Sequence, residues 1–449
     1  MGAMDKIDFK RIFDESLDDL TGLLKIHSVY DQNTADERMP YGLNVHKAFE
    51  YMRDLAIRDG FNVREYDGHA LSFSYGEGKE RIDIASHLDV VAAKDEDFNI
   101  HIEDGKLFGR GTSDMKVPMF LTYLSLKMLK ERYPKLNREM RIVLGMDEER
   151  TMEDMKHYVS VAGYPDFAFT PDGFFPMGIG EKGAIMWTIR GEYKGIIKSL
   201  EAGSQCNIIS PVAQCIIKAN DIDRVNKYIA ENDIDGKAEL VDDMIDITIK
   251  GRAAHASTPF LGHSATNDLL KLMAELYDDA MCKNLYKTYG DHYGRGFESY
   301  VSEDPYECLS VNLGVFKIND GKAFGQVDCR YPFKDNAKEL TSRLSKASDL
   351  DVSLDYNDDP TECSEDDPYV KVMLKTYRGL TGDESRPIIS GGVSYSKVFK
   401  HCVSFGPITI DKPSVAHCDG EFVYLDDCLH WFEIYYRTIE NLALMEEQK

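Results

Sequence analysis

Cysteine is missing from the first 205 residues of this chain. The nine cysteines, from Cys206 to Cys428, contain no Cys-x-x-Cys pair. An odd number of scattered cysteines argues against a disulfide framework and favours a reducing compartment. No apolar run approaches the roughly 20 residues of a membrane-spanning helix. The N-terminus, MGAMDKIDFK, also lacks the apolar core of a signal peptide. We therefore expect a cytoplasmic protein that does not enter a membrane.

Positive charge is in short supply. The 449 residues include 53 Lys and Arg against 78 Asp and Glu, a formal net charge of −25. Such a surface repels phosphate backbones, so we do not expect nucleic-acid binding. The hydrophobic fraction of 43% is ordinary for a globular protein, and the length predicts two to three domains.

Strands and helices alternate over the first 183 residues. Helical periodicity covers residues 7–26 and 44–58, and a further helix over 118–132 has Pro118 at its first position. Strand-like runs lie between and after these helices: LSFSY, RIDIAS, MRIVLGM and DFAFT. This order predicts a mostly parallel sheet in an α/β domain.

The pattern changes after residue 183. Strand runs over 184–377 alternate apolar and polar residues, as in a sheet with one face covered by helices, and we expect irregular structure over 286–306. We interpret 184–377 as an inserted α+β domain. Residues 378–449 then complete the α/β domain that 1–183 begin.

Acidic and histidine residues follow the predicted strands at the positions where they end. In open α/β sheets the carboxyl ends of the strands carry the ligand site. Each residue alone is more typical of a turn or a helix cap, but together they provide two imidazoles and a surplus of carboxylates. The set is His87, Asp89, Asp114, Glu148, Glu149, Asp172 and His417.

The residue types suit a site for two metal ions. His87 and Asp89 are two apart in a strand and can lie on one side of it, so Asp89 can fix the tautomer of His87. Asp114 can bridge two cations through its two oxygens, or it can cap the helix that follows. Histidine and carboxylate ligands favour zinc, with cobalt or manganese as alternatives. Cys418 is either a further ligand or an incidental small apolar residue.

These motifs resemble the metal-dependent exopeptidases that include peptidase V, carnosinase-like dipeptidases, acetylornithine deacetylase and carboxypeptidase G. The likeness is closest to the bacterial peptidase V-type dipeptidases and covers nearly the whole chain. It implies a zinc exopeptidase-like catalytic domain with an inserted lid domain. The motifs that carry it are SHLDVV, DGKLFGRGTSDMK, GMDEE, PDGFFPMGIGEKG, GRAAHAS, DCRYP, GGVSYS, FGP and the region of His417.

The resemblance also implies roles for individual residues. It makes His87, Asp114 and Asp172 the ligands of one zinc, and Asp114, Glu149 and His417 those of a second. Glu148 becomes the general base and Asp89 the residue that orients His87. In the lid, the resemblance implies that His255 contacts the developing oxyanion, although the nearby His263 is an alternative. Positions that match substrate contacts are Asn207, Arg330, Gly391 and Gly392.

A dipeptidase that cleaves short peptides with a free C-terminal carboxylate is the function this resemblance favours. An N-acyl amino-acid deacylase with the same metal site is the alternative within the enzyme class. A catalytically silent binding protein is the alternative outside it. We expect a small peptide substrate, two Zn²⁺ per chain and a monomer, with a dimer as the alternative state.

Overall fold

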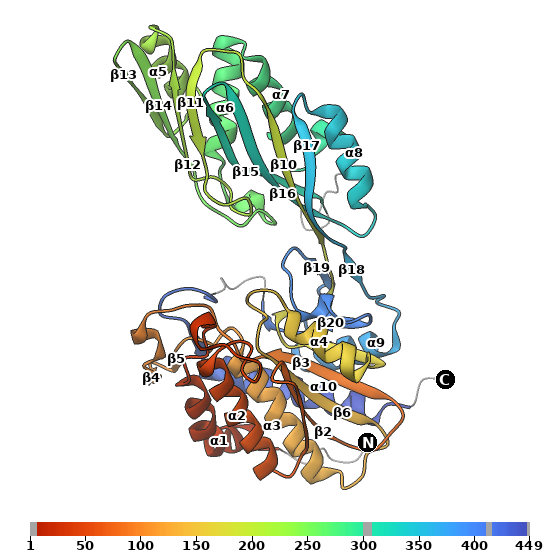
Figure 1. Ribbon diagram of the computed structural model, residues 1–449. Coiled ribbons are helices and arrows are strands. Elements are labelled where there is room, and N and C mark those ends of the chain that lie inside the picture. The colour runs from red at the N-terminus through yellow and green to blue at the C-terminus, as the bar shows by residue number, and fades with distance from the viewer. Residues whose placement is uncertain (1–6, 300–307, 410–414, 447–449) are drawn as a thin grey trace. The chain divides into compact units, whose positions relative to one another are not determined.

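The computed structural model describes residues 7–299, 308–409 and 415–446. The chain forms two compact units, and each takes more than one segment of the sequence (Figure 1). The first unit contains Met1–Gly180, Cys363–Ile388 and Val393–Lys449. The second unit contains Glu181–Glu362 and Ile389–Gly392. The second unit is therefore inserted into the first.

A nine-stranded sheet forms the centre of the first unit, in the order β1-β2-β6-β3-β7-β20-β9-β18, with β19 beside β9. The strands β6, β3, β7 and β20 are parallel, whereas β1, β2 and β9 pair antiparallel with their neighbours. The strand bounds are β1 (Asn62–Tyr66), β2 (Ala70–Tyr75), β3 (Arg81–His87), β6 (Glu139–Gly145), β7 (Phe167–Thr170), β9 (Gly178–Glu181), β18 (Thr361–Glu362), β19 (Ile388–Ser390) and β20 (Cys402–Ser404).

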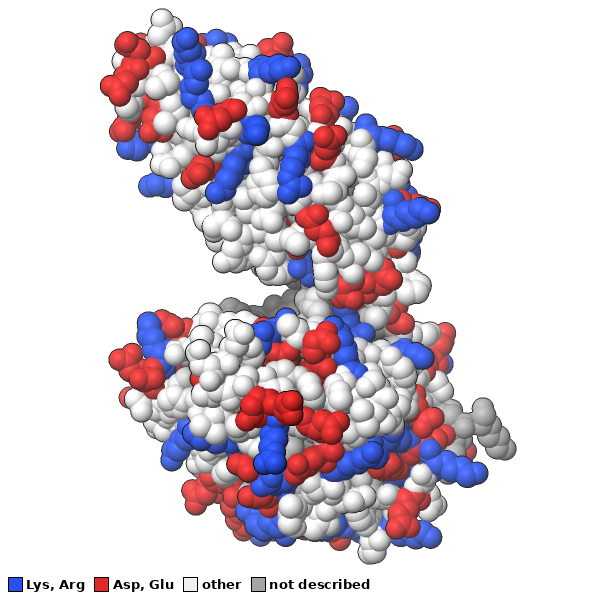
Figure 2. All heavy atoms as spheres, in the orientation of Figure 1, with Lys and Arg blue, Asp and Glu red and all other residues white. Residues whose placement is uncertain are grey.

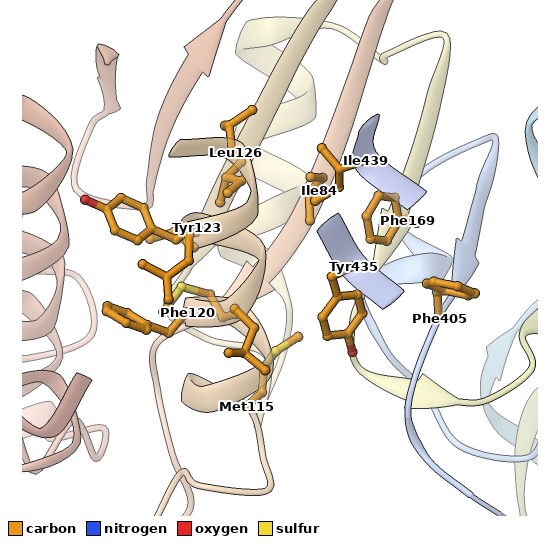
Figure 3. Close-up of a cluster of buried hydrophobic side chains, with 14 of the residues drawn as sticks. Ile84, Met115, Phe120, Tyr123, Leu126, Phe169, Phe405, Tyr435 and Ile439 are labelled. Atoms are coloured by element: carbon orange, nitrogen blue, oxygen red, sulfur yellow. The ribbon is translucent and has the colours of Figure 1, made fainter. Parts of the chain in front are cut away.

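Both faces of this sheet are covered, so successive residues of its central strands are buried. Along β3, Ile82 and Ile84 join the larger core, and Ala85 joins a smaller core with Met155 of α4. Figure 3 shows part of the larger core, where side chains of α3 and α10 meet Ile84 and Phe169. The helices are α1 (Phe9–Leu24), α2 (Leu43–Arg58), α3 (Lys116–Arg132), α4 (Glu153–Ala162), α9 (Pro368–Thr381) and α10 (Leu425–Leu444).

Short strands complete the first unit. A three-stranded sheet has the order β22-β5-β4, and β21 pairs with β8. Because β5 and β22 are antiparallel neighbours, the loop after β5 lies beside the segment that precedes β22. The bounds are β4 (His101–Glu103), β5 (Lys106–Phe108), β8 (Gly173–Phe174), β21 (Pro407–Ile408) and β22 (Phe422–Tyr424).

The second unit is an antiparallel sheet of eight strands in the order β13-β14-β12-β11-β15-β16-β10-β17. Burial alternates along β12 and β14, so one face of the sheet packs against helices. The strands are β10 (Gly183–Glu192), β11 (Ile197–Ala202), β12 (Val212–Ile217), β13 (Gly236–Val241), β14 (Met244–Lys250), β15 (Ser310–Asn319), β16 (Lys322–Tyr331) and β17 (Asp351–Asp358). The helices are α5 (Ile222–Glu231), α6 (Ala265–Tyr277), α7 (Ala280–Tyr289) and α8 (Ala337–Ala347).

Two expectations from the sequence differ from the structure. The insertion was expected to end at residue 377, but the chain enters the first unit at Cys363. The reason is that α9 buries Val370 and Met373 in the core that α10 also lines. The segment 286–306 was expected to be irregular, yet Tyr289 is the last residue of α7, and residues 300–306 lie outside the described part.

A buried carboxylate lies at the centre of the first sheet. Asp83 of β3 is fully buried, accepts a hydrogen bond of 2.7 Å from the Tyr158 hydroxyl and lies 3.1 Å from Arg81 Nε. Burial raises the pKa of Asp83 to about 6, although the nearby Arg81 and Arg141 oppose the shift. The folded state therefore holds this proton more tightly than the unfolded state does.

Replacing Asp83 with asparagine is expected to remove a pH dependence of stability. The carboxyl has a pKa of 3.8 when unfolded and about 6 when folded. The tighter proton binding stabilises the folded state by about 3 kcal/mol. This stabilisation is fully present below pH 3.8 and is lost as the pH rises through 6. The unfolding free energy of Asp83→Asn minus that of the wild type should therefore increase between pH 4 and 6.5. Denaturant titrations across this range measure it, and a pH-independent difference would contradict the assignment.

Acidic side chains are spread over the surfaces of both units, interspersed with Lys and Arg (Figure 2). All nine cysteines lie in the described ranges, and none is joined to another in a disulfide. In the part of the chain that the structure describes, no helix combines the length and the apolar character needed to cross a bilayer.

Candidate metal centre

The parallel strands deliver four of the predicted residues to one edge of the first sheet. His87 is the last residue of β3, Glu148 and Glu149 follow β6, and Asp172 follows β7. Neighbouring parallel strands end at the same edge, so their carboxyl-terminal side chains converge. This topology explains why residues far apart in the sequence meet.

Asp114 lies between the two predicted histidine ligands. Its Oδ1 is 3.2 Å from His87 Nε2, and its Oδ2 is 2.9 Å from His417 Nε2. The helix α3 begins at Lys116 with Met115 at the N-cap, so the Asp114 carboxylate does not cap that helix. Each oxygen of Asp114 therefore faces a different imidazole, which is the arrangement needed to bridge two cations.

Each imidazole also has a carboxylate of its own. Asp172 Oδ2 is 3.7 Å from His87 Nε2, and Glu149 Oε2 is 3.1 Å from His417 Nε2. Single ligand atoms of His87, Asp114 and Glu149 lie within 4.8 Å of one another. The structure thus contains a candidate metal site at Asp114.

Glu148 reaches the same cluster from the His87 side. Atoms of His87, Glu148 and Asp172 also lie within 4.8 Å of one another. Burial, together with the carboxylates of Asp172 and Asp114, holds the pKa of Glu148 well above its usual value, although His87 opposes them. A carboxyl with a raised proton affinity is suited to accepting and returning a proton.

Asp89 holds the centre together through more contacts than the sequence suggested. The Nδ1 of His87 donates to the backbone carbonyl of Asp89 at 2.9 Å, while the Asp89 carboxylate lies 3.5 Å from that nitrogen. The two oxygens of that carboxylate accept the backbone N–H groups of Glu148 at 3.3 Å and Glu149 at 3.1 Å. Because Nδ1 faces the Asp89 carbonyl, Nε2 is the ring nitrogen of His87 that faces Asp114 and Asp172 and that a metal ion would use.

The donor atoms fit divalent cations. Among the described residues, neither His87 Nε2 nor Asp114 Oδ1 has a hydrogen-bond partner, although both atoms are buried. Buried polar atoms are normally paired, and a cation would satisfy both. Asp114, then Glu149, raises the pKa of His417 to about 10. In the metal-free protein, protonated imidazole thus balances the negative charge of the carboxylates. Bound metal ions can provide that positive charge instead.

His255, Asn207 and Arg330, which were predicted for the lid, lie in the second unit. Gly391 and Gly392 were expected in the second part of the catalytic domain, but Ile389–Gly392 also belong to the second unit. Residues Asn207 and Ile208 run beside His255 and Ala256, with the Ala256 N–H donating to the Asn207 carbonyl at 2.8 Å. Gly391 packs on the same segment, because a Cβ there would lie 2.5 Å from the Cβ of Ser257. The Gly392 N–H donates to the Ser390 hydroxyl.

Arg330 and His255 are electrostatic neighbours in this unit. Arg330 pairs with Asp328 through two contacts of 3.0 Å, from Nε and from Nη2. Burial, followed by the Arg330 charge, lowers the pKa of His255 below its usual value. The Ser257 N–H donates to His255 Nδ1 at 3.1 Å, so the proton of the neutral ring sits on Nε2.

The alternative histidine has a different environment. His263 is 58% exposed at its side chain and pairs with Asp268 of α6 at 2.7 Å. The His263 ring nitrogen is engaged by the Asp268 carboxylate, whereas the pKa of the more buried His255 is lowered, which favours its neutral form. His255 is therefore the better candidate for a neutral N–H donor.

Two supporting carboxylates were not predicted. Glu421 is fully buried and accepts the backbone N–H groups of Gly111, Ser113 and Asp114. Asp154 of α4 is also fully buried and accepts N–H groups from Met146 and Asp147 and the hydroxyl of Tyr395. For Glu421 the sequence gives only a weak signal, its position four residues after His417. For Asp154 it gives none, because an acidic residue is common in the first turn of a helix.

Comparison with known proteins places the chain in a family. Residues 84–441 match the model of peptidase family M20/M25/M40. The chain belongs to this family. It is therefore a metal-dependent hydrolase, and the fold class and the resemblance expected from the sequence are confirmed.

Individual members of the family show how far the likeness extends. The chain is 29% identical to the Beta-Ala-Xaa dipeptidase of Lactobacillus delbrueckii subsp. lactis over 458 residues, covering 97% of both chains. Human carnosine dipeptidase 1 matches with a TM-score of 0.57 at 14% identity, covering 98% of this chain and 100% of that one. Aminoacylhistidine dipeptidase from Vibrio alginolyticus matches with a TM-score of 0.56 at 16% identity, covering 96% and 97%. At these identities the two structures support the fold.

Proposed function

We propose that this M20-family hydrolase is a dipeptidase that cleaves the peptide bond of short peptides with a free C-terminal carboxylate. The observation that carries the proposal is the Asp114 carboxylate, whose two oxygens face His87 and His417 at 3.2 and 2.9 Å. The 29% identity to a Beta-Ala-Xaa dipeptidase over nearly the whole chain supports the substrate class.

Two zinc ions suit the centre, because its donors are imidazole nitrogens and carboxylate oxygens without a thiolate. His87, Asp114 and Asp172 would hold one ion, and Asp114, Glu149 and His417 the other. When bound, the ions supply Lewis acidity and lower the pKa of the attacking water toward neutrality. The exposed Cys418 is not needed for either ligand set.

Glu148 moves the proton in this proposal. Its carboxylate takes a proton from the attacking water and then delivers it to the leaving amine, so one group serves as base and acid in turn. Asp89 positions Glu148, because its carboxylate accepts the Glu148 N–H at 3.3 Å. The same carboxylate accepts the Glu149 N–H, so Asp89 fixes the backbone of both glutamates.

The residues of the second unit are proposed to bind substrate. The Nε2–H of neutral His255 suits a developing oxyanion, for which one donor is typically worth about 3–4 kcal/mol. Arg330 carries five N–H donors, and Asp328 accepts from two of its nitrogens. The guanidinium therefore keeps capacity for a substrate carboxylate. Asn207, Gly391 and Gly392 complete the proposed contacts.

A substrate panel tests the function. The purified protein is loaded with zinc, cobalt or manganese and assayed against α-dipeptides, β-alanyl dipeptides, aminoacyl-histidines, and N-acetyl and N-succinyl amino acids. We expect hydrolysis of dipeptides and a loss of at least about tenfold in kcat/KM when the C-terminal carboxylate is amidated, because a charge-assisted pair is lost.

The outcomes of the panel are distinct. Turnover of the N-acyl amino acids in preference to dipeptides would replace the proposal with a deacylase. No turnover of any substrate, with fewer than one metal ion bound per chain, would indicate a binding protein. The same panel identifies the working metal, because each substrate is measured with all three ions.

A further inference from the structure

Glu421 binds the loop that carries Asp114. Its Oε1 accepts the backbone N–H groups of Ser113 at 2.6 Å and of Asp114 at 3.0 Å, and its Oε2 accepts that of Gly111 at 3.2 Å. The side chain is fully buried, so water does not compete for these contacts. One carboxylate thus accepts hydrogen bonds from three backbone N–H groups within four consecutive residues.

Arg110 extends this contact to the segment that carries His417. Its Nη1 donates to Glu421 Oε2 at 2.8 Å, and its Nη2 donates to the Cys418 carbonyl at 3.2 Å. The Gly109 N–H donates to the Glu421 carbonyl at 2.9 Å. The buried pair is neutral overall, because the guanidinium charge balances the carboxylate charge.

The position of Glu421 follows from strand pairing. Phe422 of β22 lies opposite Phe108 of β5, so the residue before β22 is placed beside the residues after β5. Glu421 lies three residues before the end of β22 and four after His417, at the junction of both segments. It is therefore attached to the two chain segments that must be in register for Asp114 and His417 to meet.

We propose that Glu421 is a positioning residue that sets the Asp114 carboxylate relative to His417, so that one oxygen of Asp114 faces each metal position. This inference rests on the proposed two-metal function. Replacing a residue that hydrogen-bonds to a metal ligand commonly weakens metal affinity by about 10- to 100-fold. Glu421 acts through the backbone of the Asp114 loop and through Arg110, and it supplies no ligand atom itself.

Glu421→Gln tests the proposal with little change in volume. One atom of the new amide is a donor, so it cannot accept the N–H groups and the guanidinium that now share the carboxylate. Titration of the metal-free protein with zinc should show binding about 10- to 100-fold weaker than in the wild type. The visible absorption of the cobalt-loaded variant should also change, because the ligand geometry around the metal changes.

Glu440→Gln provides a matched control. Glu440 of α10 is a buried carboxylate of the same unit that accepts the hydroxyls of Tyr133 at 2.9 Å and Tyr436 at 2.8 Å, and it pairs with Arg437. Both variants lose a buried charge and should lower the Tm of the metal-free protein. Only Glu421→Gln should weaken zinc binding and alter the cobalt spectrum.

The results separate this inference from the proposed function. Zinc affinity and a cobalt spectrum equal to the wild type in Glu421→Gln, with a lowered Tm, would overturn the positioning role and leave the function standing. If Glu421→Gln does not fold, Glu421→Asp keeps the charge and withdraws the carboxylate by one methylene. Weaker zinc binding in that variant supports the role, and unchanged binding overturns it. Wild-type protein that holds no zinc would instead overturn the metal centre itself.

Discussion

Glu148→Ala is expected to lower kcat by about 10³- to 10⁴-fold while leaving the metal ions bound and the fold intact. The reason is that Glu148 is proposed to serve as base and then as acid, so both proton transfers lose their partner. The loss corresponds to about 4 to 5.5 kcal/mol in the activation free energy. KM should change little, because the interaction is made in the transition state rather than with the bound substrate.

Steady-state kinetics and metal analysis on the same samples measure this effect. Glu153→Gln is the control, because Glu153 is a largely exposed acid of the neighbouring α4 that pairs with Lys156. Its kcat should equal that of the wild type. Glu148 also lies within reach of His87 and Asp172, so the metal content decides between two roles. Loss of metal from Glu148→Ala would make Glu148 a ligand, and unchanged peptide hydrolysis would remove it from the mechanism.

Asp114→Asn is expected to disrupt both metal positions and to lower activity by about 10³-fold or more. An amide has only one oxygen and one NH₂ group, so it cannot place a ligand oxygen toward both His87 and His417. Metal ions are commonly worth several kcal/mol of transition-state stabilisation in such sites, and each 1.36 kcal/mol corresponds to a factor of ten in rate. Equilibrium dialysis followed by elemental analysis measures the metal content.

Variants at the outer carboxylates give the matched comparison. Asp172→Asn and Glu149→Gln each change one side of the centre, since Asp172 approaches His87 and Glu149 approaches His417. Each should weaken one of two binding steps in a zinc titration and leave the other near its wild-type value. Two full-affinity zinc ions in Asp114→Asn would rule out a bridging role for this residue.

Much of the first unit could be predicted because its strands and helices are recognisable from patterns within short segments of sequence. The run RIDIAS, which the sequence analysis identified as strand-like, forms β3 and is buried on both faces. The parallel order then placed His87, Glu149 and Asp172 at one edge. The start of α3 was harder, because Pro118 signalled a later first turn than the Lys116 at which the helix begins. The helix α7 was missed although Cys282, Leu285 and Tyr289 are buried at helical spacing, since its Tyr and Gly neighbours suggested a loop.

The parts of the centre that escaped prediction depend on tertiary contacts. Glu421 meets Asp114 only because β22 pairs with β5, and no periodicity within either short strand specifies this partner. Asp89 was expected to orient His87 through its carboxylate, yet its carbonyl takes that contact and the carboxylate holds two amides. Residue types and strand ends therefore indicate which side chains gather, whereas the atoms that make each contact depend on the packed loops.

The order of synthesis has a consequence for when this protein can become active. Strand β20 lies between β7 and β9 in the sheet, and His417 follows it in the chain. The ribosome therefore synthesises the whole inserted unit before β20 and His417. A chain that ends before β20 lacks both the strand between β7 and β9 and the imidazole of His417. The proposed metal centre can therefore be complete only after the inserted unit has been synthesised.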